Sequence, residues 1–247
     1  GPGGAAELGA LSPRWRDHVR ELEQRGWVLR VREDVVATGT TTTAVAREPG
    51  PELTPEQDAA VGAIVAAHGC YTPFLLHGVT GSGKTEVYLR AIGAVVAHGE
   101  QALVLVPEIS LTPQLVARFA ARIPGPLAVL HSGLTDTDRL QAWRAARAGS
   151  AAVVIGTRSA VFAPLARPGL IVIDEEHETT FKQETAPRYH ARDVALFRAR
   201  DEKVPLVLGS ATPSLESWQR AQRGECRLIE LPKRVLLGGT QVGEDIE

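Results

Sequence analysis

FLLHGVTGSGKT, residues 74–85, is the stretch of this sequence that decides its fold. A short apolar run leads into the pattern G-x-x-x-x-G-K-T, and a helical pattern follows over 86–96, which predicts a strand, a phosphate-binding loop and a helix in that order. The glycines let backbone N–H groups turn inward around a polyphosphate, and the helix N-terminus adds positive potential. Nucleotide contacts are therefore predicted from Gly78, Thr80, Gly81, Ser82, Gly83, Lys84 and Thr85, with Lys84 on the β- and γ-phosphates and Thr85 on Mg²⁺.

Further apolar runs of strand length alternate with helical patterns along the chain. Several are apolar throughout, as expected for strands covered by helices on both faces of a parallel sheet. The fold class predicted is therefore α/β, with a central, mostly parallel sheet, and functional sites are expected where the strands end. These runs are Ala102–Val106, Leu127–Leu130, Ala152–Ile155, Leu170–Ile173 and Pro205–Leu208.

A helix start precedes the phosphate loop, in the sequence Leu53-Thr54-Pro55-Glu56-Gln57. Thr54 is predicted as the N-cap, and Pro55 suits the first turn. The amide of Gln57 can read the edge of an adenine. The alternative for Gln57 is a solvated residue of the first helical turn.

One strand delivers a carboxylate pair, in the sequence Asp174-Glu175-Glu176-His177. We expect Asp174 to hold Mg²⁺, and Glu175 to orient and deprotonate the water that attacks the phosphate. His177 has two interpretations: a core or capping residue, or a relay between nucleotide and polymer sites. The catalytic candidates are Lys84, Asp174, Glu175 and His177, and Ser210 and Thr212 at the last strand end are candidates for coupling.

Three other strand ends carry hydroxyls, helix starts and one arginine. Such groups can follow a phosphodiester backbone without reading bases, although each alone is more often a helix cap. The segment 178–193 adds basic residues interleaved with two rings, which suits stacking on unpaired bases; the alternative is that the rings pack into the sheet. The DNA-binding candidates are Pro107, Glu108, Ser110, Thr112, Ser132, Thr157, Arg158, Phe181, Lys182, Arg188, Tyr189 and His190.

Composition bounds the class of protein. The chain has 247 residues, 44% of them apolar and 23% charged, with a formal net charge of −2, so any DNA contact requires a local patch rather than bulk charge. No apolar run is long enough to span a bilayer, and no membrane partner is expected. Cys70 and Cys226 lack the spacing of a disulfide framework or a zinc site, which fits a reducing cytoplasm.

The domain boundaries follow from changes in composition and in hydrophobic pattern along the sequence. Residues 1–12 resemble an expression tag, and residues 13–37 show a helix that ends near Gly26 and a short strand, as at the end of a winged-helix module. Residues 38–51 are a linker by composition, 52–231 form the α/β lobe, and the tail 232–247 is not assigned.

Together, GVTGSGKTEVYL, LVPEISLTPQ, GTRSAVFAP, DEEH with KQ and PRYHARD, and GSATPSLES resemble the primosomal replication-restart helicases, the PriA family of superfamily two. The resemblance covers residues 53–231 and implies a RecA-like P-loop lobe and an ATP- and Mg²⁺-dependent 3′→5′ DNA helicase. It further implies that the whole protein recognises stalled forks and single-stranded DNA, works with single-stranded DNA-binding protein, and reloads the replicative helicase with its loader in the bacterial cytoplasm, at the nucleoid. Zinc is expected only in a region that this sequence lacks. The chain departs from many relatives at Glu178 and Phe181, where they carry Asp and Tyr.

Two other functions stay open. A fork-binding scaffold could recruit partners without unwinding, and a duplex translocase could use the same motor fold. Because the second motor lobe supplies arginines to the ATP site in such motors, this chain alone is expected to hydrolyse ATP negligibly. All of these expectations require the loop ending at Thr85 and the strand end at Asp174 to face each other across one site.

Overall fold

The computed structural model describes Asp17 and residues 50–235, and residues 50–235 fall within a single compact unit. The expected tag at 1–12, nearly all of the expected winged-helix piece at 13–37, the linker up to residue 49 and the tail from residue 236 lie outside the described residues.

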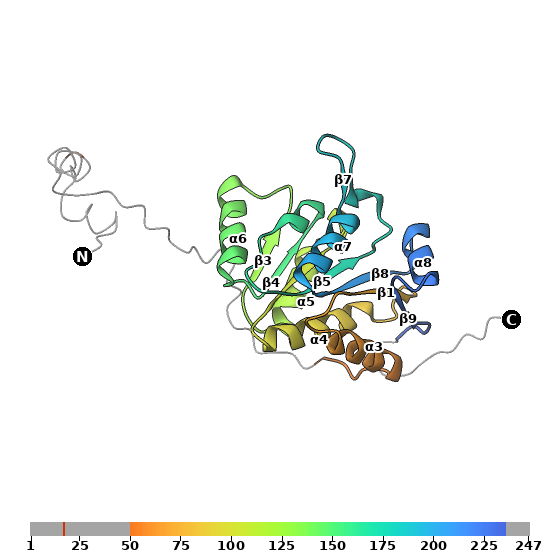
Figure 1. Ribbon diagram of the computed structural model, residues 1–247. Coiled ribbons are helices and arrows are strands. Elements are labelled where there is room, and N and C mark those ends of the chain that lie inside the picture. Colours follow the sequence, from red (N-terminus) through yellow and green to blue (C-terminus); the bar gives the residue numbers. More distant parts are fainter. Residues whose placement is uncertain (1–16, 18–49, 236–247) are drawn as a thin grey trace. The chain divides into compact units, whose positions relative to one another are not determined.

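A seven-stranded sheet forms the centre of the described unit, in the order β3-β4-β2-β5-β8-β1-β9 (Figure 1). Every pairing in this sheet is parallel, so the predicted α/β class with a mostly parallel sheet is confirmed. The strands are β1 (Thr72–Gly78), β2 (Gln101–Leu105), β3 (Leu127–Leu130), β4 (Val153–Gly156), β5 (Pro168–Asp174), β8 (Pro205–Ser210) and β9 (Arg227–Leu231). A separate antiparallel hairpin pairs β6 (Lys182–Gln183) with β7 (Tyr189–His190).

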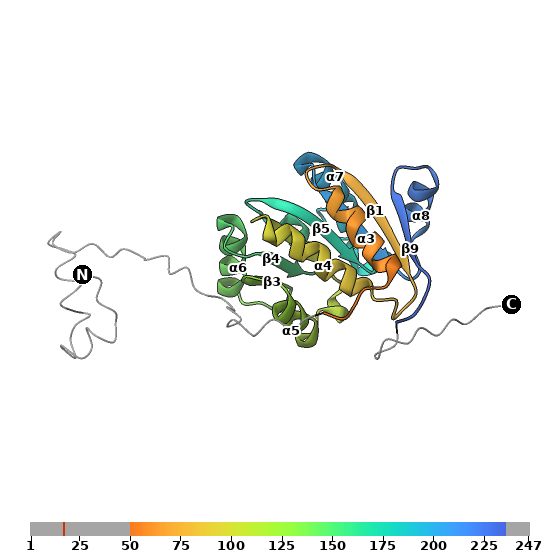
Figure 2. The ribbon, with the colours of Figure 1, turned by 90° about the horizontal axis from the view of Figure 1, so that it is seen from below.

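Helices cover both faces of the sheet (Figures 1 and 2). One face carries α3 (Pro55–Ala66), α4 (Lys84–Ala97) and α5 (Pro113–Arg122), and the other carries α6 (Asp136–Ala148), α7 (Ala191–Glu202) and α8 (Leu215–Gln222). Two apolar cores result, one on each side of the sheet, because the central strands are buried on both faces. Short 3₁₀ helices span Glu108–Ser110, Arg158–Phe162 and Thr179–Phe181.

The strand order brings three functional loops together. β8 lies between β5 and β1, so the segments that follow Gly78, Asp174 and Ser210 emerge side by side at the carboxyl ends of these strands. In a parallel α/β sheet, ligands bind at the carboxyl ends of the strands.

β9 is the strand of the main sheet that the sequence did not predict. It pairs with β1 at the sheet edge, and its residues are mostly exposed. Because Arg227 and Glu230 interrupt its apolar residues, it lacks the continuous apolar run of a buried strand.

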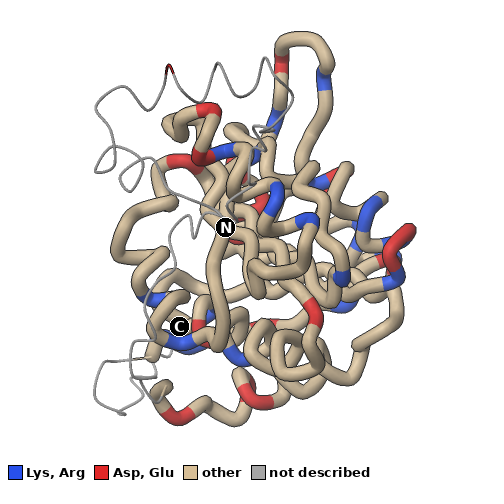
Figure 3. Tube along the Cα trace, turned by 90° about the vertical axis from the view of Figure 1, so that its left-hand side faces the viewer, with Lys and Arg blue, Asp and Glu red and all other residues tan. Residues whose placement is uncertain are grey.

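Charges of both signs are interspersed along the trace on the side shown in Figure 3, and no single basic face stands out there. This agrees with the net charge of −2 and leaves DNA contacts to local groups. Within the part of the chain that the structure describes, no helix has the length and apolarity that a membrane span requires.

Candidate active site

The phosphate loop connects the end of β1 to the start of α4, as its sequence predicts. Gly81 and Gly83 have φ values of 83° and 84°, a left-handed conformation that glycine adopts without steric cost. The ammonium of Lys84 is buried and donates to the carbonyl oxygen of Gly78 at 2.8 Å. The hydroxyl of Ser82 is also buried and has no hydrogen-bond partner. The loop therefore offers buried donors that an anionic ligand would satisfy.

Gln57 is attached to this loop. Thr54 caps α3, and its backbone N–H donates to Gln57 Oε1 at 3.0 Å, which forms a capping box. The Gln57 amide then donates from Nε2 to the carbonyl of Ser82 at 2.8 Å. Gln57 is 3% exposed, so the alternative of a solvated first-turn residue is wrong. A Cβ at Gly83 would collide with this amide, which explains the glycine there.

The acidic strand end faces the phosphate loop. β5 ends at Asp174, whose Oδ1 accepts a hydrogen bond from the Tyr88 hydroxyl of α4 at 3.0 Å. The next carboxylate, Glu175 Oε1, lies 4.0 Å from Lys84 Nζ. The two elements on which the sequence interpretation depended therefore share one site.

Burial, and next the neighbouring Glu175 carboxylate, raise the pKa of Asp174 to about 6. A carboxylate destabilised in this way gains most from a cation. Among the described residues no group of three or more His, Cys, Asp or Glu side chains gathers as a metal site. Mg²⁺ does not need one, since it binds through one or two carboxylates together with substrate phosphates and water.

His177 connects the acidic strand end to the last strand. Its Nδ1 lies 2.7 Å from Ser210 Oγ and 3.7 Å from Glu175 Oε2, and its Nε2 lies 3.4 Å from Thr212 Oγ1. The ring is half-buried between these groups. The structure therefore brings both predicted coupling residues to the histidine.

The three candidate DNA-contacting strand ends lie beside one another, because β2, β4 and β3 are adjacent. The Ser132 hydroxyl donates to Glu108, and a cavity of about 210 Å³ lined by Glu108, Ser132, Thr157 and Arg158 opens between them. Arg158 is engaged inside the protein, since its Nη1 donates to the carbonyls of Thr180 and Lys182.

Other members of this set are used in local structure. The Thr112 side chain caps α5 by accepting from Leu115 N, and Ser110 belongs to the 3₁₀ helix 108–110. Pro107 and Thr157 are both buried, so the expectation that these two side chains meet DNA is wrong.

The expectation that Phe181 stacks on bases is wrong as well. Its ring is 1% exposed and packs in the core on the α7 side of the sheet. The other ring, Tyr189, is half-buried and contacts Phe162 edge to face, with ring centroids 5.0 Å apart. Phe162 is 45% exposed. Sequence reasoning missed Phe162 because it lies outside the basic and aromatic segment.

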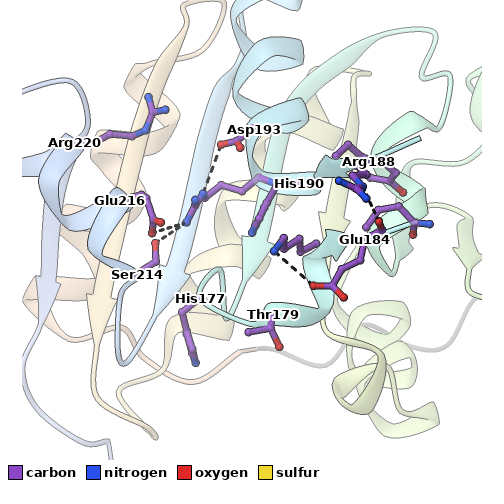
Figure 4. A pocket seen from close by; sticks show the side chains of 13 residues that line it. His177, Thr179, Glu184, Arg188, His190, Asp193, Ser214, Glu216 and Arg220 are labelled. Carbon is purple, nitrogen blue, oxygen red and sulfur yellow. Dashed lines mark hydrogen bonds and ion pairs between the residues drawn. The ribbon is translucent and has the colours of Figure 1, made fainter. Parts of the chain in front are cut away.

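The polar members of that segment line a cavity of about 1000 Å³ between the hairpin and the starts of α7 and α8 (Figure 4). Lys182 lies 3.5 Å from Glu184, and Arg188 donates to the Glu184 carbonyl at 3.0 Å. His190 is the N-cap of α7 and accepts from Arg192 N, and burial lowers the pKa of its imidazole.

Glu176 is a residue that the sequence interpretation passed over. It is completely buried and binds the Arg192 guanidinium at 3.0 Å. It also accepts hydrogen bonds from Ser214 and Ser217 of the GSATPSLES stretch. A glutamate at the end of a buried strand was the available signal, but its partners lie 16 to 41 positions away.

The fold and this site define a nucleotide-binding lobe of the helicase class: a RecA-like α/β domain with a phosphate loop facing a carboxylate pair. A family model described as DEAD/DEAH box helicase matches residues 54–221. The chain belongs to the DEAD/DEAH box helicase family. Solved structures agree on the fold alone. The structure of RecG bound to a three-way DNA junction matches with a TM-score of 0.56 and 24% sequence identity, over 77% of this chain and 25% of that one. The structure of MrfA bound to DNA matches with a TM-score of 0.53 and 17% sequence identity, over 75% of this chain and 30% of that one.

Within that family, the chain is similar to part of the replication restart protein PriA. It is 56% identical over 162 residues to PriA of Bacillus subtilis (strain 168), which is 66% of this chain and 20% of the relative. It is 46% identical over 209 residues to PriA of Treponema pallidum (strain Nichols), which is 85% of this chain and 32% of the relative. The resemblance that the motifs predicted is confirmed, and the chain spans about a fifth to a third of the length of these relatives.

Proposed function

We propose that this chain is the ATP-binding lobe of a 3′→5′ DNA helicase that recognises stalled replication forks and restarts replication. ATP hydrolysis in this lobe would be coupled to movement along single-stranded DNA. The observation that supports this best is the 4.0 Å approach of Lys84 Nζ to Glu175 Oε1, beside the strand ends that carry the DNA-contact candidates.

The residues at the phosphate loop fit a nucleoside triphosphate with Mg²⁺. The unpartnered Ser82 hydroxyl, the left-handed Gly81 and Gly83 and the buried Lys84 ammonium suit a chain of phosphates. Gly78 and Thr80 complete the loop, and Gln57 is proposed to contact the adenine while holding Ser82. Thr85 and Asp174 are proposed as metal ligands; when bound, Mg²⁺ neutralises charge on the phosphates.

Glu175 is the proposed general base. Its carboxylate lies close enough to Lys84 to be held at the γ-phosphate end of the site, where it can orient a water and accept its proton. His177 contacts Glu175 and Ser210, so a change at the hydrolysis site can pass to the segment 210–212. This is the relay and coupling role that we assign to His177, Ser210 and Thr212.

DNA is proposed to run across the neighbouring strand ends. Glu108, Ser110, Thr112, Ser132 and Arg158 would lie along its backbone, and Lys182, Arg188, Tyr189 and His190 would approach the unpaired bases and phosphates. Of the two rings predicted to stack on bases, Phe181 and Tyr189, we retain Tyr189, whose ring contacts Phe162.

We also propose that the chain is one lobe of a longer enzyme in the bacterial cytoplasm. That enzyme would work with single-stranded DNA-binding protein, the replicative helicase and its loader, and would carry any zinc outside these residues. The domain limits 13–37, 38–51 and 52–231 are proposed in the same sense. Because a second lobe would complete the ATP site with arginines, this chain alone should hydrolyse ATP negligibly.

The test compares the full-length protein with its Lys84→Ala variant on forked DNA. Unwinding and DNA-stimulated ATP hydrolysis should be lost in Lys84→Ala, and the exposed control Lys203→Ala should retain both. Fork binding without unwinding by the wild-type protein would instead identify a fork-binding scaffold. Equal stimulation by plain duplex and by forked or single-stranded DNA would identify a duplex translocase.

A further inference from the structure

Two consecutive glutamates at the end of β5 point to different parts of the molecule. Glu175 approaches Lys84 in the nucleotide site, whereas Glu176 is 0% exposed and contacts α7 and α8. The backbone of Glu175 has a φ of 48°, in the left-handed region that residues other than glycine seldom adopt. This conformation separates the two carboxylates, so the contacts of one constrain the direction of the other.

The surroundings of Glu176 form a closed polar cluster. Its Oε2 accepts from Arg192 Nη1 at 3.0 Å, from Ser214 Oγ at 2.9 Å and from Ser217 Oγ at 2.7 Å. Its Oε1 accepts from the backbone N–H of Ser214 at 2.7 Å. Four donors on one buried carboxylate leave it little freedom to move.

The cluster is attached directly to the hairpin on the DNA side. β7 ends at His190, which caps α7, and Arg192 belongs to the first turn of that helix. Arg192 Nη1 donates to Ser214 Oγ and lies 3.8 Å from Glu216 Oε2, both at the start of α8. The hairpin 182–190 is therefore connected to the buried Glu176 through the first turn of α7 and the Arg192 ion pair.

We propose that Glu176 is a positioning residue that couples the hairpin 182–190 to the hydrolysis carboxylate Glu175. Arg192 is its partner on the hairpin side, and Ser214 and Ser217 fix it to the segment after β8. This inference rests on the proposed function, because it states how DNA contact would reach the ATP site. A buried ion pair contributes little net stability, which agrees with a role in specifying geometry.

The experiment uses Glu176→Gln in the full-length protein, which keeps the shape and removes the charge. We expect the ratio of ATP hydrolysis with saturating single-stranded DNA to hydrolysis without DNA to fall about tenfold, a typical coupling between sites. Dissociation constants for the DNA and for a non-hydrolysable ATP analogue should each stay within about threefold of wild type, a shift small beside that coupling. Glu216→Gln is the matched control, since this exposed carboxylate also approaches Arg192, at 3.8 Å, and its ratio should stay at the wild-type value.

An unchanged ratio in Glu176→Gln would overturn the proposal. So would a parallel loss of DNA affinity, nucleotide affinity and thermal stability, which indicates a role in folding alone. If Glu176→Gln does not fold, Ser217→Ala decides: it removes one donor and should lower the ratio about fivefold, the factor that corresponds to one hydrogen bond.

A second readout separates this proposal from the proposed function. If the wild-type protein lacks ATP hydrolysis altogether, the proposed function fails, and amide hydrogen exchange in the hairpin 182–190 then decides the coupling. The ATP analogue should slow exchange there in the wild-type protein and not in Glu176→Gln. The same response in both proteins, or none in the wild type, would refute the coupling.

Discussion

The raised pKa of Asp174 leads to a prediction about stability and pH. Burial and the Glu175 carboxylate raise this pKa from its usual 3.8 to about 6 in the folded protein. Between these two values the folded state holds a proton that the unfolded state has released, so the free energy of unfolding falls as pH rises from about 4 to about 6. Above pH 6 the destabilisation is complete, and below pH 4 it is absent.

Asp174→Asn removes this titration and keeps an oxygen that can accept from the Tyr88 hydroxyl. A shift of about two pKa units corresponds to about 3 kcal/mol, so at pH 8 the variant should be more stable than the wild type by up to that amount. The difference should become small near pH 4, because the Asp174 carboxyl is then protonated and neutral in the folded wild-type protein, like the asparagine amide.

Urea unfolding of this chain between pH 4 and pH 8, with EDTA present to remove divalent cations, measures the difference. Asp193→Asn is the control for replacing an aspartate by asparagine, since Asp193 is exposed at the start of α7, away from the phosphate loop. A stability difference between Asp174→Asn and wild type that is constant across this range would refute the reasoning.

Three more predictions concern neighbouring residues. Phe181→Ala should lower the free energy of unfolding by about 3–5 kcal/mol, measured by urea unfolding. Tyr189→Ala should instead weaken binding of single-stranded DNA by about 1–3 kcal/mol, measured by fluorescence anisotropy. A Phe181→Ala variant that loses DNA binding and keeps its stability would contradict the burial argument. Gly209→Ala should lower the free energy of unfolding by about 1–3 kcal/mol, because the added Cβ meets the Tyr88 hydroxyl. Adding Tyr88→Phe to this variant should recover part of the loss, as measured by thermal unfolding of the two single variants and the double variant. Calorimetry should show that the Mg²⁺ complex of an ATP analogue binds more weakly as pH falls below 6, because a proton then competes with the metal for Asp174. Binding that does not change between pH 5 and pH 8 would exclude Asp174 as a metal ligand.

The sequence predicted those parts of the fold in which local pattern and tertiary environment agree. The six apolar runs became parallel strands, with ends that differ from the prediction by at most two residues, because burial on both faces selects apolar residues at every position. The phosphate loop and the N-cap at Thr54 are local motifs, so they could be predicted from spacing alone. β9 was missed because an exposed edge strand needs no continuous apolar run.

Contacts between distant segments could not be predicted in the same way. Glu176 lies next to Glu175 in sequence, yet its partners are on α7 and at the start of α8. Gln57 was predicted as a nucleotide contact, and no local pattern indicated that its amide also holds the Ser82 carbonyl. In both cases a side chain is held by partners that only the folded sheet brings near.

The burial of Phe181 shows what a phenylalanine at this position does in the fold. The resemblance described in the sequence analysis implies a tyrosine where this chain has Phe181. A tyrosine hydroxyl buried at this position would need a hydrogen-bond partner, whereas phenylalanine needs none. The residue at position 181 therefore affects packing beneath the hairpin, while the half-buried Tyr189 contacts the exposed Phe162 from a separate segment. Arg158, four residues before Phe162, donates to the Thr180 and Lys182 carbonyls, so the segment that carries Phe162 is hydrogen-bonded to the start of the hairpin that carries Tyr189.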